Sequence, residues 1–257
     1  MNHPAILSTR SFTISSLTAA TETLLGVRPI PLLITEIGQE LSPSGRFTFN
    51  LESSLREERL FSDEIRDDLV LPSSAAAGRR SFKLYGSGFY VPAGDVLRVW
   101  TSDRSGADNT VRIYVKGTYI TEELPPDVDL TRQHVTYWSD SLTVAANTTL
   151  PAFMRVKDDF ILRAITLVAT GDLVLGVRSR KRNDQLWATG LRLNSIAPSG
   201  GTTSERPFMV VPGFLFPQGD TIEISATDRT GSTNTVLAAF HGETPVPCPT
   251  HEKPVVV

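Results

Sequence analysis

The chain has 257 residues, a formal net charge of −3, 40% hydrophobic residues and 21% charged residues. These values are typical of a folded chain of one large or two small domains, and they exclude a disordered protein. The mildly acidic balance argues against a nucleic-acid partner, and the absence of any run of 18 apolar residues argues against a membrane span.

Cysteine and histidine usage narrows the function classes further. A single cysteine cannot build a disulfide framework within the chain or a multi-thiolate zinc site. The four histidines, His3, His134, His241 and His251, are too far apart for the usual helical or cupin-type metal motifs. We therefore expect no metal and no cofactor.

The first structured unit is predicted over residues 11–120, after an N-terminal arm of residues 1–10. Within this unit, apolar and polar residues alternate over residues 46–51 and 111–116. Alternation with a period of two is typical of strands that have one buried and one solvated face. The charged stretch over residues 51–71 is predicted to be a short helix or an elaborated loop.

The chain contains a second copy of this unit. Residues 88–117 and 213–242 align without a gap at an offset of 125 residues, and 12 of the 30 aligned pairs are identical. Two shorter upstream blocks recur in the same order, 11–14 with 141–144 and 45–51 with 171–177. Such self-similarity indicates an internal duplication.

The duplication sets the remaining domain boundaries. The second unit is predicted over residues 139–243. Residues 121–138 carry the segment Glu-Glu-Leu-Pro-Pro-Asp and are predicted to be an extended linker between the units.

Both copies carry the loop Asp-Arg-Ser/Thr-Gly-x-x-Asn-Thr before their last strand. Its candidate residues are Asp103, Arg104, Gly106 and Asn109 in the first copy and Asp228, Arg229, Gly231 and Asn234 in the second. Gly and Asn suit the positive φ of a hairpin loop, and Asp suits a turn in which its carboxylate accepts backbone N–H groups.

Two further interpretations of this loop are open. The Asp and Asn oxygens could bind calcium, but the loops lack the run of alternating acidic residues that is typical of calcium sites, so the turn interpretation is favoured. The two arginines are expected to pair with a carboxylate of their own unit or, as the alternative, with a neighbouring subunit.

The turn pattern favours a jelly roll. The 18 Gly and 17 Pro are spread along the chain and predict many turns and few long helices. About eight short strands in each unit fit a jelly roll best, whereas an immunoglobulin-like sandwich, the alternative, usually has about seven. The predicted fold is therefore all-β, with two tandem, internally duplicated jelly-roll-like β-sandwich domains and extended terminal arms.

Sequence signatures of catalysis are missing. The chain has no Gly-x-Ser-x-Gly elbow, no phosphate-binding loop and no dinucleotide fingerprint. His241 is interpreted as a surface or partly buried strand residue, in preference to a catalytic base. The chain is predicted not to be an enzyme, with a catalytic set assembled in space on a β scaffold as the alternative.

Three tryptophans, Trp100, Trp138 and Trp187, raise the question of a sugar platform. The second copy has Ser225 where the first has Trp100, so the copies do not share an aromatic site. Packing in the core or between the units is favoured for these rings.

Residues 244–257 are predicted to be a C-terminal arm. Their prolines exclude a helix or a central strand, and their valines can be buried only against another surface. The arm is therefore expected to dock on a neighbouring chain. Its candidate assembly residues are Pro245, Val246, Pro247, Pro249, Pro254, Val255, Val256 and Val257.

The repeated Phe-x-x-Pro-x-Gly-Asp segments (89–95 and 214–220), the repeated hairpin and the arms resemble the accessory structural proteins of tailed-bacteriophage virions. The resemblance implies a virion protein, assembled in the host cytoplasm, that has no catalytic activity. It also implies symmetric assembly with copies of itself and with major capsid or other virion proteins. A capsid decoration or cement protein is favoured, because arms that lace adjacent subunits suit that role. A neck, collar or baseplate component and a carbohydrate-binding host-attachment module are the alternatives.

Overall fold

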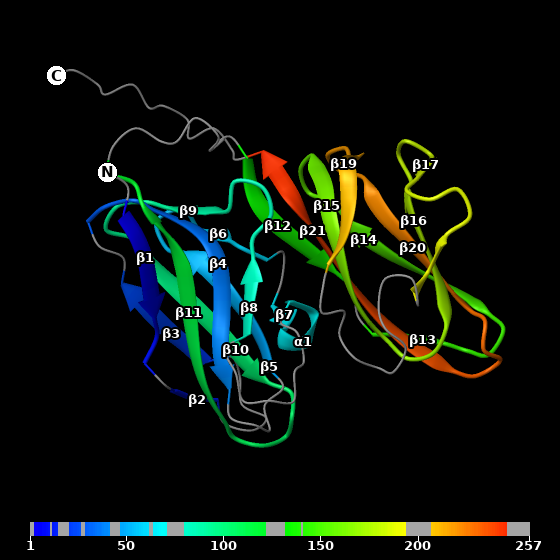
Figure 1. Ribbon diagram of the computed structural model, residues 1–257, viewed down its shortest axis with the longest axis horizontal. Coiled ribbons are helices and arrows are strands. Elements are labelled where there is room, and N and C mark those ends of the chain that lie inside the picture. Colours follow the sequence, from blue (N-terminus) through cyan, green and yellow to red (C-terminus); the bar gives the residue numbers. More distant parts are fainter. Residues whose placement is uncertain are drawn as a thin grey trace.

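A computed structural model of the chain describes residues 3–10, 12–14, 21–26, 29–41, 47–61, 64–70, 80–121, 132–139, 141–193 and 207–245. Apart from one short helix, α1 (Asp67–Val70), the regular elements of these residues are all β-strands. The strands form two β-sandwiches that lie side by side, an N-terminal one in blue to green and a C-terminal one in green to red (Figure 1). The predicted all-β fold is confirmed.

The first sandwich consists of two antiparallel sheets. One has the strand order β1-β11-β4-β8, with β2 beside β11 and β9 beside β4; the other has the order β3-β10-β5-β6, with β7 beside β5. The bounds are β1 (His3–Ser8), β2 (Phe12–Ile14), β3 (Thr21–Gly26), β4 (Leu32–Leu41), β5 (Phe47–Ser53), β6 (Glu58–Arg59), β7 (Ile65–Arg66), β8 (Arg80–Lys83), β9 (Phe89–Val91), β10 (Val96–Asp103) and β11 (Asn109–Tyr119).

The second sandwich repeats this plan. Its sheets have the orders β12-β21-β15-β19, with β13 beside β21, and β14-β20-β16-β17, with β18 beside β16. The bounds are β12 (Arg132–Trp138), β13 (Leu142–Val144), β14 (Thr149–Arg155), β15 (Phe160–Ala169), β16 (Leu173–Ser179), β17 (Asp184–Gln185), β18 (Leu191–Arg192), β19 (Phe208–Phe216), β20 (Thr221–Asp228) and β21 (Asn234–Pro245).

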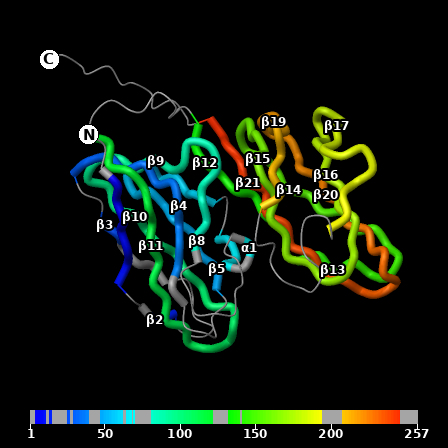
Figure 2. Tube along the Cα trace, in the orientation of Figure 1, coloured from blue at the N-terminus to red at the C-terminus, as the bar shows by residue number. Residues whose placement is uncertain are grey.

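The duplication holds at the level of strand register. The last strand of each unit lies inside its sheet, next to the first and fourth strands of the unit (Figure 2). In the other sheet, Asp103 pairs with Phe47, and Asp228 pairs with Leu173 at the corresponding position. Both units are thus jelly rolls with the same connectivity, as the repeated sequence blocks predicted.

Each jelly roll has its own core between its two sheets. Strand β20 alternates fully between buried and partly exposed residues, which is the pattern of a strand with one core-facing side. Phenylalanines fill the centre of both cores, among them Phe47 and Phe49 in the first and Phe160 and Phe216 in the second. The apolar half of each alternating pattern is therefore the half that is buried.

Three predicted boundaries are wrong. Residues His3–Ser8 are not an arm, because they form β1 and pair along their whole length with β11. Residues 132–138 are not part of a linker, because they form β12 and pair with β21. Strand β21 also extends past the predicted end of its domain and includes Thr244 and Pro245.

The ambiguous stretch 51–71 contains both predicted kinds of structure. It holds the end of β5, the two-residue strands β6 and β7, and α1, while residues 62–63 and 71 lie outside the described residues. The second unit has the same elaboration, because β17 and β18 pair with β16 at the positions where β6 and β7 pair with β5. Among the described residues, only α1 has no helical counterpart there.

One buried aspartate secures the same turn in each jelly roll. Both Asp95 and Asp220 are 1% exposed. The groups that donate to Asp95 are the Ser53 hydroxyl (2.5 Å) and the backbone N–H groups of Leu55 (3.0 Å) and Val96 (2.6 Å). The groups that donate to Asp220 are the Ser179 hydroxyl and the backbone N–H groups of Lys181 (2.9 Å) and Thr221 (2.6 Å).

Replacing this carboxylate should destabilise either unit to a similar extent. Asp220→Ala leaves one buried hydroxyl and two N–H groups without their acceptor, so we expect the free energy of unfolding to fall by about 2–4 kcal/mol. Asp95→Ala should have an effect of the same size. Denaturant unfolding measures both, and a loss below about 0.5 kcal/mol in either variant would contradict the assignment.

Candidate functional site

The repeated hairpin loops have the same geometry in both jelly rolls. The φ angles of Gly106 and Gly231 are 75° and 70°, in the left-handed region. Asp103 accepts from the N–H groups of Ser105 (3.0 Å) and Gly106 (2.9 Å), and from the Asn109 amide (2.6 Å). The second loop repeats these contacts, with Asp228 accepting from Thr230 N–H (3.0 Å), Gly231 N–H (2.9 Å) and the Asn234 amide (2.8 Å).

These contacts explain what the loop residues do locally. Each asparagine presents its NH₂ group to the aspartate, so the carboxylate oxygens face hydrogen-bond donors, as in a structural turn. The backbone N–H of Asn147, which donates to Asp228 (2.9 Å), lowers the pKa of Asp228 below its ordinary value, and the donors of Thr230 and Asn234 add to this effect. The side chains of Arg104 and Arg229 are exposed, and within the described part of the chain neither has a carboxylate at ion-pair distance.

The two jelly rolls meet along the outer face of the sheet β12-β21-β15-β19. Strand β21 is buried from Val236 to Thr244, on both of its faces. The corresponding strand of the first unit, β11, has Arg112, Tyr114 and Lys116 on its outer side, where β21 has Leu237, Ala239 and His241. Leu237 and Ala239 join the core cluster of the first jelly roll, which covers this face.

A row of hydrogen bonds runs through the middle of this joint. The hydroxyl of Thr166 donates to the backbone carbonyl of Leu69 (2.7 Å) in the first jelly roll. Because that hydrogen is used, the Thr166 oxygen accepts from His241 Nε2 (2.8 Å). A neutral His241 ring then carries no proton on Nδ1, which accepts from the hydroxyl of Thr136 (2.8 Å).

The row continues back to the first jelly roll. Thr136 accepts from Nε2 of His134 (3.0 Å), and Nδ1 of His134 accepts from the backbone N–H of Tyr85 (3.1 Å). Both imidazoles are fully buried, with 0% exposure. A carbonyl that can only accept therefore fixes the direction of the whole row and the tautomer of both rings.

Burial keeps both histidines neutral. Desolvation lowers the pKa of His134 to about 3. The carbonyl of Tyr85, 3.3 Å from Nδ1, acts in the opposite direction because it can accept only from a protonated Nδ1. Desolvation, and then the nearby His134 ring, hold the pKa of His241 well below its ordinary value. The interpretation of His241 as a surface or partly buried residue is wrong, because the first jelly roll covers the face on which it lies.

The turn after β8 supplies further contacts of the joint. The backbone N–H of His134 donates to the carbonyl of Gly88 (3.0 Å), and the hydroxyl of Ser87 donates to the carbonyl of Arg132. Gly86 has a φ of 65°, and a Cβ there would collide with the side chain of Glu243. The turn thus lies against β12 and β21 so closely that its backbone pairs with β12.

The repeat itself contained a signal for this joint. At three outward positions of the last strand, a charged or phenolic side chain of the first copy is replaced by Leu237, Ala239 or His241 in the second. Attention to identical positions alone missed this difference. Loss of polar side chains from one copy of a duplicated strand indicates that this copy is covered.

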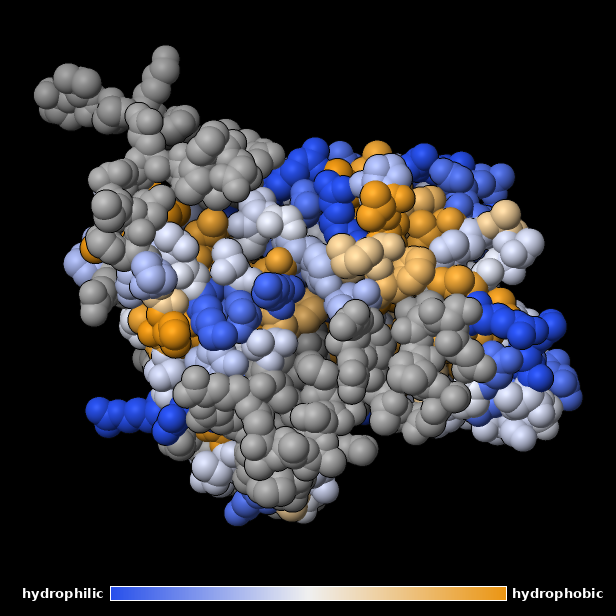
Figure 3. Space-filling view, viewed as in Figure 1, coloured by the Kyte–Doolittle hydropathy of each residue, from blue (hydrophilic) through white to orange (hydrophobic). Residues whose placement is uncertain are grey.

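An apolar strip lies on the edge strand of the second jelly roll. The strand β19 pairs with β15 alone, and its exposed side chains include Met209, Val211 and Leu215. Figure 3 shows apolar side chains gathered over this part of the second sandwich. Exposed apolar side chains on a sheet edge mark a surface that another protein can cover.

The arm residues divide between the described and the remaining part of the chain. Pro245 is the last residue of β21 and pairs with Arg132. The other seven candidate residues, Val246, Pro247, Pro249, Pro254, Val255, Val256 and Val257, lie outside the described residues.

The described residues contain no group of three or more His, Cys, Asp or Glu side chains arranged to hold a metal ion. None of their helices has the length and apolar character needed to cross a membrane.

The fold, unlike the sequence, has relatives among known proteins. No protein-family model and no curated protein sequence matches the chain. The major capsid protein P2 from Bacteriophage PM2 matches with a TM-score of 0.57 and 14% identity, over 95% of this chain and 98% of that chain. The STIV MCP matches with a TM-score of 0.50 and 11% identity, over 98% of this chain and 100% of that chain.

A third match, to a peptide-N(4)-(N-acetyl-beta-D-glucosaminyl) asparagine amidase, has a TM-score of 0.39 and 9% identity, over 95% of this chain and 97% of that chain. At such identities the likeness is one of fold. The matches at 0.50 and 0.57 establish that the tandem jelly-roll architecture is shared over nearly the full length of both chains.

The buried histidines predict a loss of stability in mild acid. In the unfolded chain a histidine takes up a proton near pH 6.5, whereas His134 stays neutral in the folded chain down to about pH 3. Between these values the unfolded state binds more protons, so the free energy of unfolding falls as the pH falls, by up to about 1.4 kcal/mol per pH unit for each histidine.

Denaturant unfolding between about pH 6 and about pH 4.5 measures this slope. The control is His134→Gln, whose amide can donate to Thr136 but does not titrate. The free energy of unfolding of this variant should depend less steeply on pH, because one fewer proton is taken up on unfolding. Equal slopes in the two proteins would contradict the neutral, buried state of His134.

Proposed function

We propose that this chain is a non-enzymatic structural protein of a virus particle, whose copies pack side by side in the shell. The proposal is supported by the full-length likeness to the major capsid protein P2 from Bacteriophage PM2 and to the STIV MCP. That likeness favours a shell-building subunit over the decoration or cement role that the sequence favoured. The observation that carries the proposal is an exposed apolar segment of β19.

This segment corresponds to the one that docks the first jelly roll on the second. Phe82 pairs with Ile37 in the first unit, and Phe208 pairs with Ile165 at the corresponding place in the second. Counting three residues on from Phe82 and from Phe208, Tyr85 corresponds to Val211. Tyr85 packs against the His241 ring in the joint (5.8 Å between ring centres), whereas Val211 is 84% exposed.

The receiving face also has an exposed counterpart. In the joint, Thr136 pairs with His241 across strands β12 and β21. The corresponding pair in the first jelly roll is Ile6 with Lys116, across β1 and β11. Ile6 is 68% exposed, although the residue at the same position of the second jelly roll is buried.

A second copy of the chain would cover both surfaces at once. The β19 segment of one copy lies on the outer face of β1 and β11 of the next, just as the turn after β8 lies on β12 and β21 within the chain. Such a head-to-tail contact uses two different patches and closes into a ring when its rotation allows. Two jelly rolls in each chain then make contacts of one type around the ring.

The C-terminal segment supplies a second contact in this proposal. Residues 246–257 retain three prolines, which donate no backbone N–H, and four valines, which gain from burial only against another surface. We infer that this arm lies on a neighbouring subunit. The exposed Arg104 and Arg229 are further candidates for contacts with neighbours.

A charge at Val211 should block assembly without unfolding the chain. Because Val211 is exposed, Val211→Asp should change the free energy of unfolding by less than about 0.5 kcal/mol. In an apolar contact the same charge should weaken self-association by about tenfold or more. Light scattering and native mass spectrometry of the purified chain measure the oligomer, and Ile6→Asp should have the same effect.

Phe153→Asp is the matched control. Phe153 is 53% exposed and lies on β14, away from both proposed surfaces. The Phe153→Asp variant should assemble like the unaltered chain. If Val211→Asp and Ile6→Asp assemble normally, or if the unaltered chain stays a monomer when expressed alone, the shell-building proposal is wrong. Assembly only in the presence of a separate capsid protein would favour the decoration role.

Deleting residues 246–257 tests the arm. Because β21 ends at Pro245, the deletion leaves every described strand intact. The midpoint of thermal unfolding should be unchanged, and the assembled particle should dissociate more readily in denaturant or at low ionic strength. A truncated chain that melts far below the full-length monomer would identify the segment as part of a core. If the particle built from the truncated chain is as stable as the full-length particle, the arm takes no part in assembly.

A further inference from the structure

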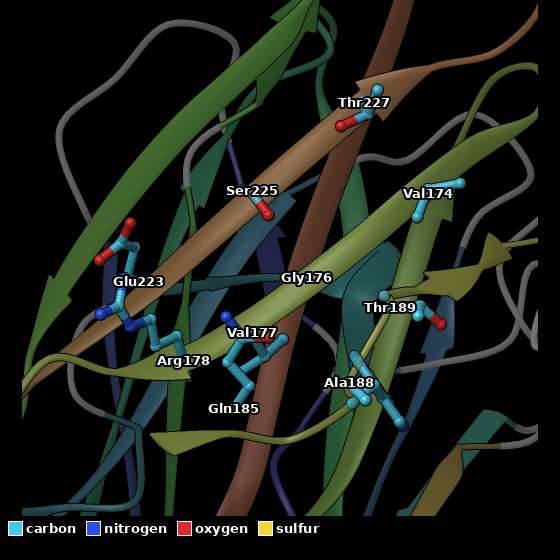
Figure 4. A pocket seen from close by; sticks show the side chains of 12 residues that line it. Val174, Gly176, Val177, Arg178, Gln185, Ala188, Thr189, Glu223, Ser225 and Thr227 are labelled. Atoms are coloured by element: carbon cyan, nitrogen blue, oxygen red, sulfur yellow. The ribbon is translucent and has the colours of Figure 1, made fainter. Parts of the chain in front are cut away.

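A hollow of about 340 Å³ opens on the outer face of the sheet β14-β20-β16-β17 (Figure 4). Its floor consists of neighbouring residues of β16 and β20, and residues 185–190 form one wall. The volume is at the lower end of the range for small-molecule sites, which leaves room for roughly one or two sugar rings.

The hollow exists because the second copy lacks side chains that the first copy has. In the first jelly roll, Asn50 and Trp100 face each other across β5 and β10. The corresponding pair across β16 and β20 is Gly176 and Ser225. A full amide and an indole in one unit are thus replaced by a hydrogen atom and a hydroxymethyl group in the other.

The first copy also closes this face with its own chain. Asn50 exchanges two hydrogen bonds with the backbone of Phe61, at 3.1 and 3.2 Å. Glu64 accepts from the hydroxyls of Thr48 and Ser102, both at 2.8 Å. These side chains therefore tie the 54–66 segment onto the sheet of the first unit. The second unit has glycines, Gly176 and Gly190, at the positions of Asn50 and Glu64, so its corresponding segment, residues 180–192, lacks these bonds.

The open face carries donors and acceptors in mixed order. Arg178 and Glu223 are partners across β16 and β20, and their charges are reversed relative to the pair Glu52 and Arg98 of the first unit. In the described part of the chain, Nε of Arg178 is buried without a hydrogen-bond partner. Hydroxyls and an amide complete the lining, from Ser225, Thr227, Thr189 and Gln185.

An aromatic ring stands at the edge of these polar groups. Trp187 lines the hollow, and its ring is held edge-on against Phe208 with the ring centres 5.6 Å apart. Such a ring, fixed by packing, offers a flat apolar surface next to hydrogen-bonding groups.

The composition of the lining selects the class of ligand. An anion needs donors, and Glu223 would repel it; a cation needs acceptors, and Arg178 would repel it. An apolar ligand would leave the hydroxyls and the amide unpaired. A ligand rich in hydroxyl groups matches the mixture, because each hydroxyl both donates and accepts, and its C–H face packs on an aromatic ring.

We propose that this hollow is a binding site for a neutral saccharide, with Trp187 as the stacking surface and Arg178, Glu223 and Ser225 as hydrogen-bonding partners. The site belongs to the second jelly roll alone, which agrees with the lack of a shared aromatic site in the two copies. Its polar residues lie on a different sheet from the β19 segment, so the site does not depend on the proposed contact between copies.

The test is a titration of the full-length chain with four probes: the methyl glycosides of glucose, galactose, mannose and N-acetylglucosamine. Ligand-observed NMR detects weak binding, and adenosine and inorganic phosphate are included as probes of other chemistry. At least one glycoside should bind. Ser225→Trp, which introduces the side chain found at position 100 of the first copy, should weaken that binding tenfold or more.

Ser232→Trp is the matched control, because it makes the same change in an exposed hairpin loop. It should bind the glycoside like the unaltered chain. Glu223→Gln keeps the volume of the side chain and removes its charge, and it should also weaken binding. The proposal is overturned if no glycoside binds, if only adenosine or phosphate binds, or if Ser225→Trp binds the glycoside as strongly as the control.

Discussion

The row of hydrogen bonds through His134 and His241 begins and ends on the backbone of the first jelly roll, while every side chain within it belongs to the second. Burial keeps both rings neutral, and because the Leu69 carbonyl can only accept, each neutral ring is held in one tautomer. A buried polar row that is satisfied in a single arrangement specifies how two surfaces meet. The chain is therefore a pair of jelly rolls in one fixed contact, in which the apolar side chains of β21 provide the burial.

The duplication explains why the two units differ where they do. Identical residues, such as Asp95 and Asp220, hold turns that both units need. Differences gather on the outer faces, where each unit meets a different environment. One outer face of the second unit is covered by the first and has Leu237, Ala239 and His241 where the first copy has an arginine, a tyrosine and a lysine. Its other outer face has Gly176 and Ser225 and is hollow.

Much of the fold could be predicted from the sequence because alternation and turn residues act locally. The 125-residue repeat and the all-β class follow from such signals. The described residues contain eleven strands in the first unit and ten in the second, where about eight were expected, because two-residue strands leave no alternation to recognise. The strand β12 could not be recognised in this way. Its residues His134 and Thr136 are polar and look solvated, yet they are buried by contact with a distant part of the chain. The N-terminal strand β1 was missed because pairing with β11, more than 100 residues away, is what defines it.

The same limit applies to the candidate sites. The loop residues Asp103 and Asp228 were found because their contacts lie within a few residues of each other. The hollow depends on three segments, two strands and the 185–190 wall, whose closeness only the fold reveals. The sequence did contain part of the evidence, since Trp100 against Ser225 was visible as a difference between the copies.

The central claim is that the contact between copies repeats the joint within the chain. The direct test is thiol cross-linking of the double variant Ile6→Cys/Val211→Cys, in a Cys248→Ser background and with a short bis-maleimide. The account predicts links between position 6 of one chain and position 211 of another, in a ladder of products that ends at the size of the closed ring, and no such ladder from either single variant. Absence of 6-to-211 links in assembled protein, or links only between identical positions, would contradict it.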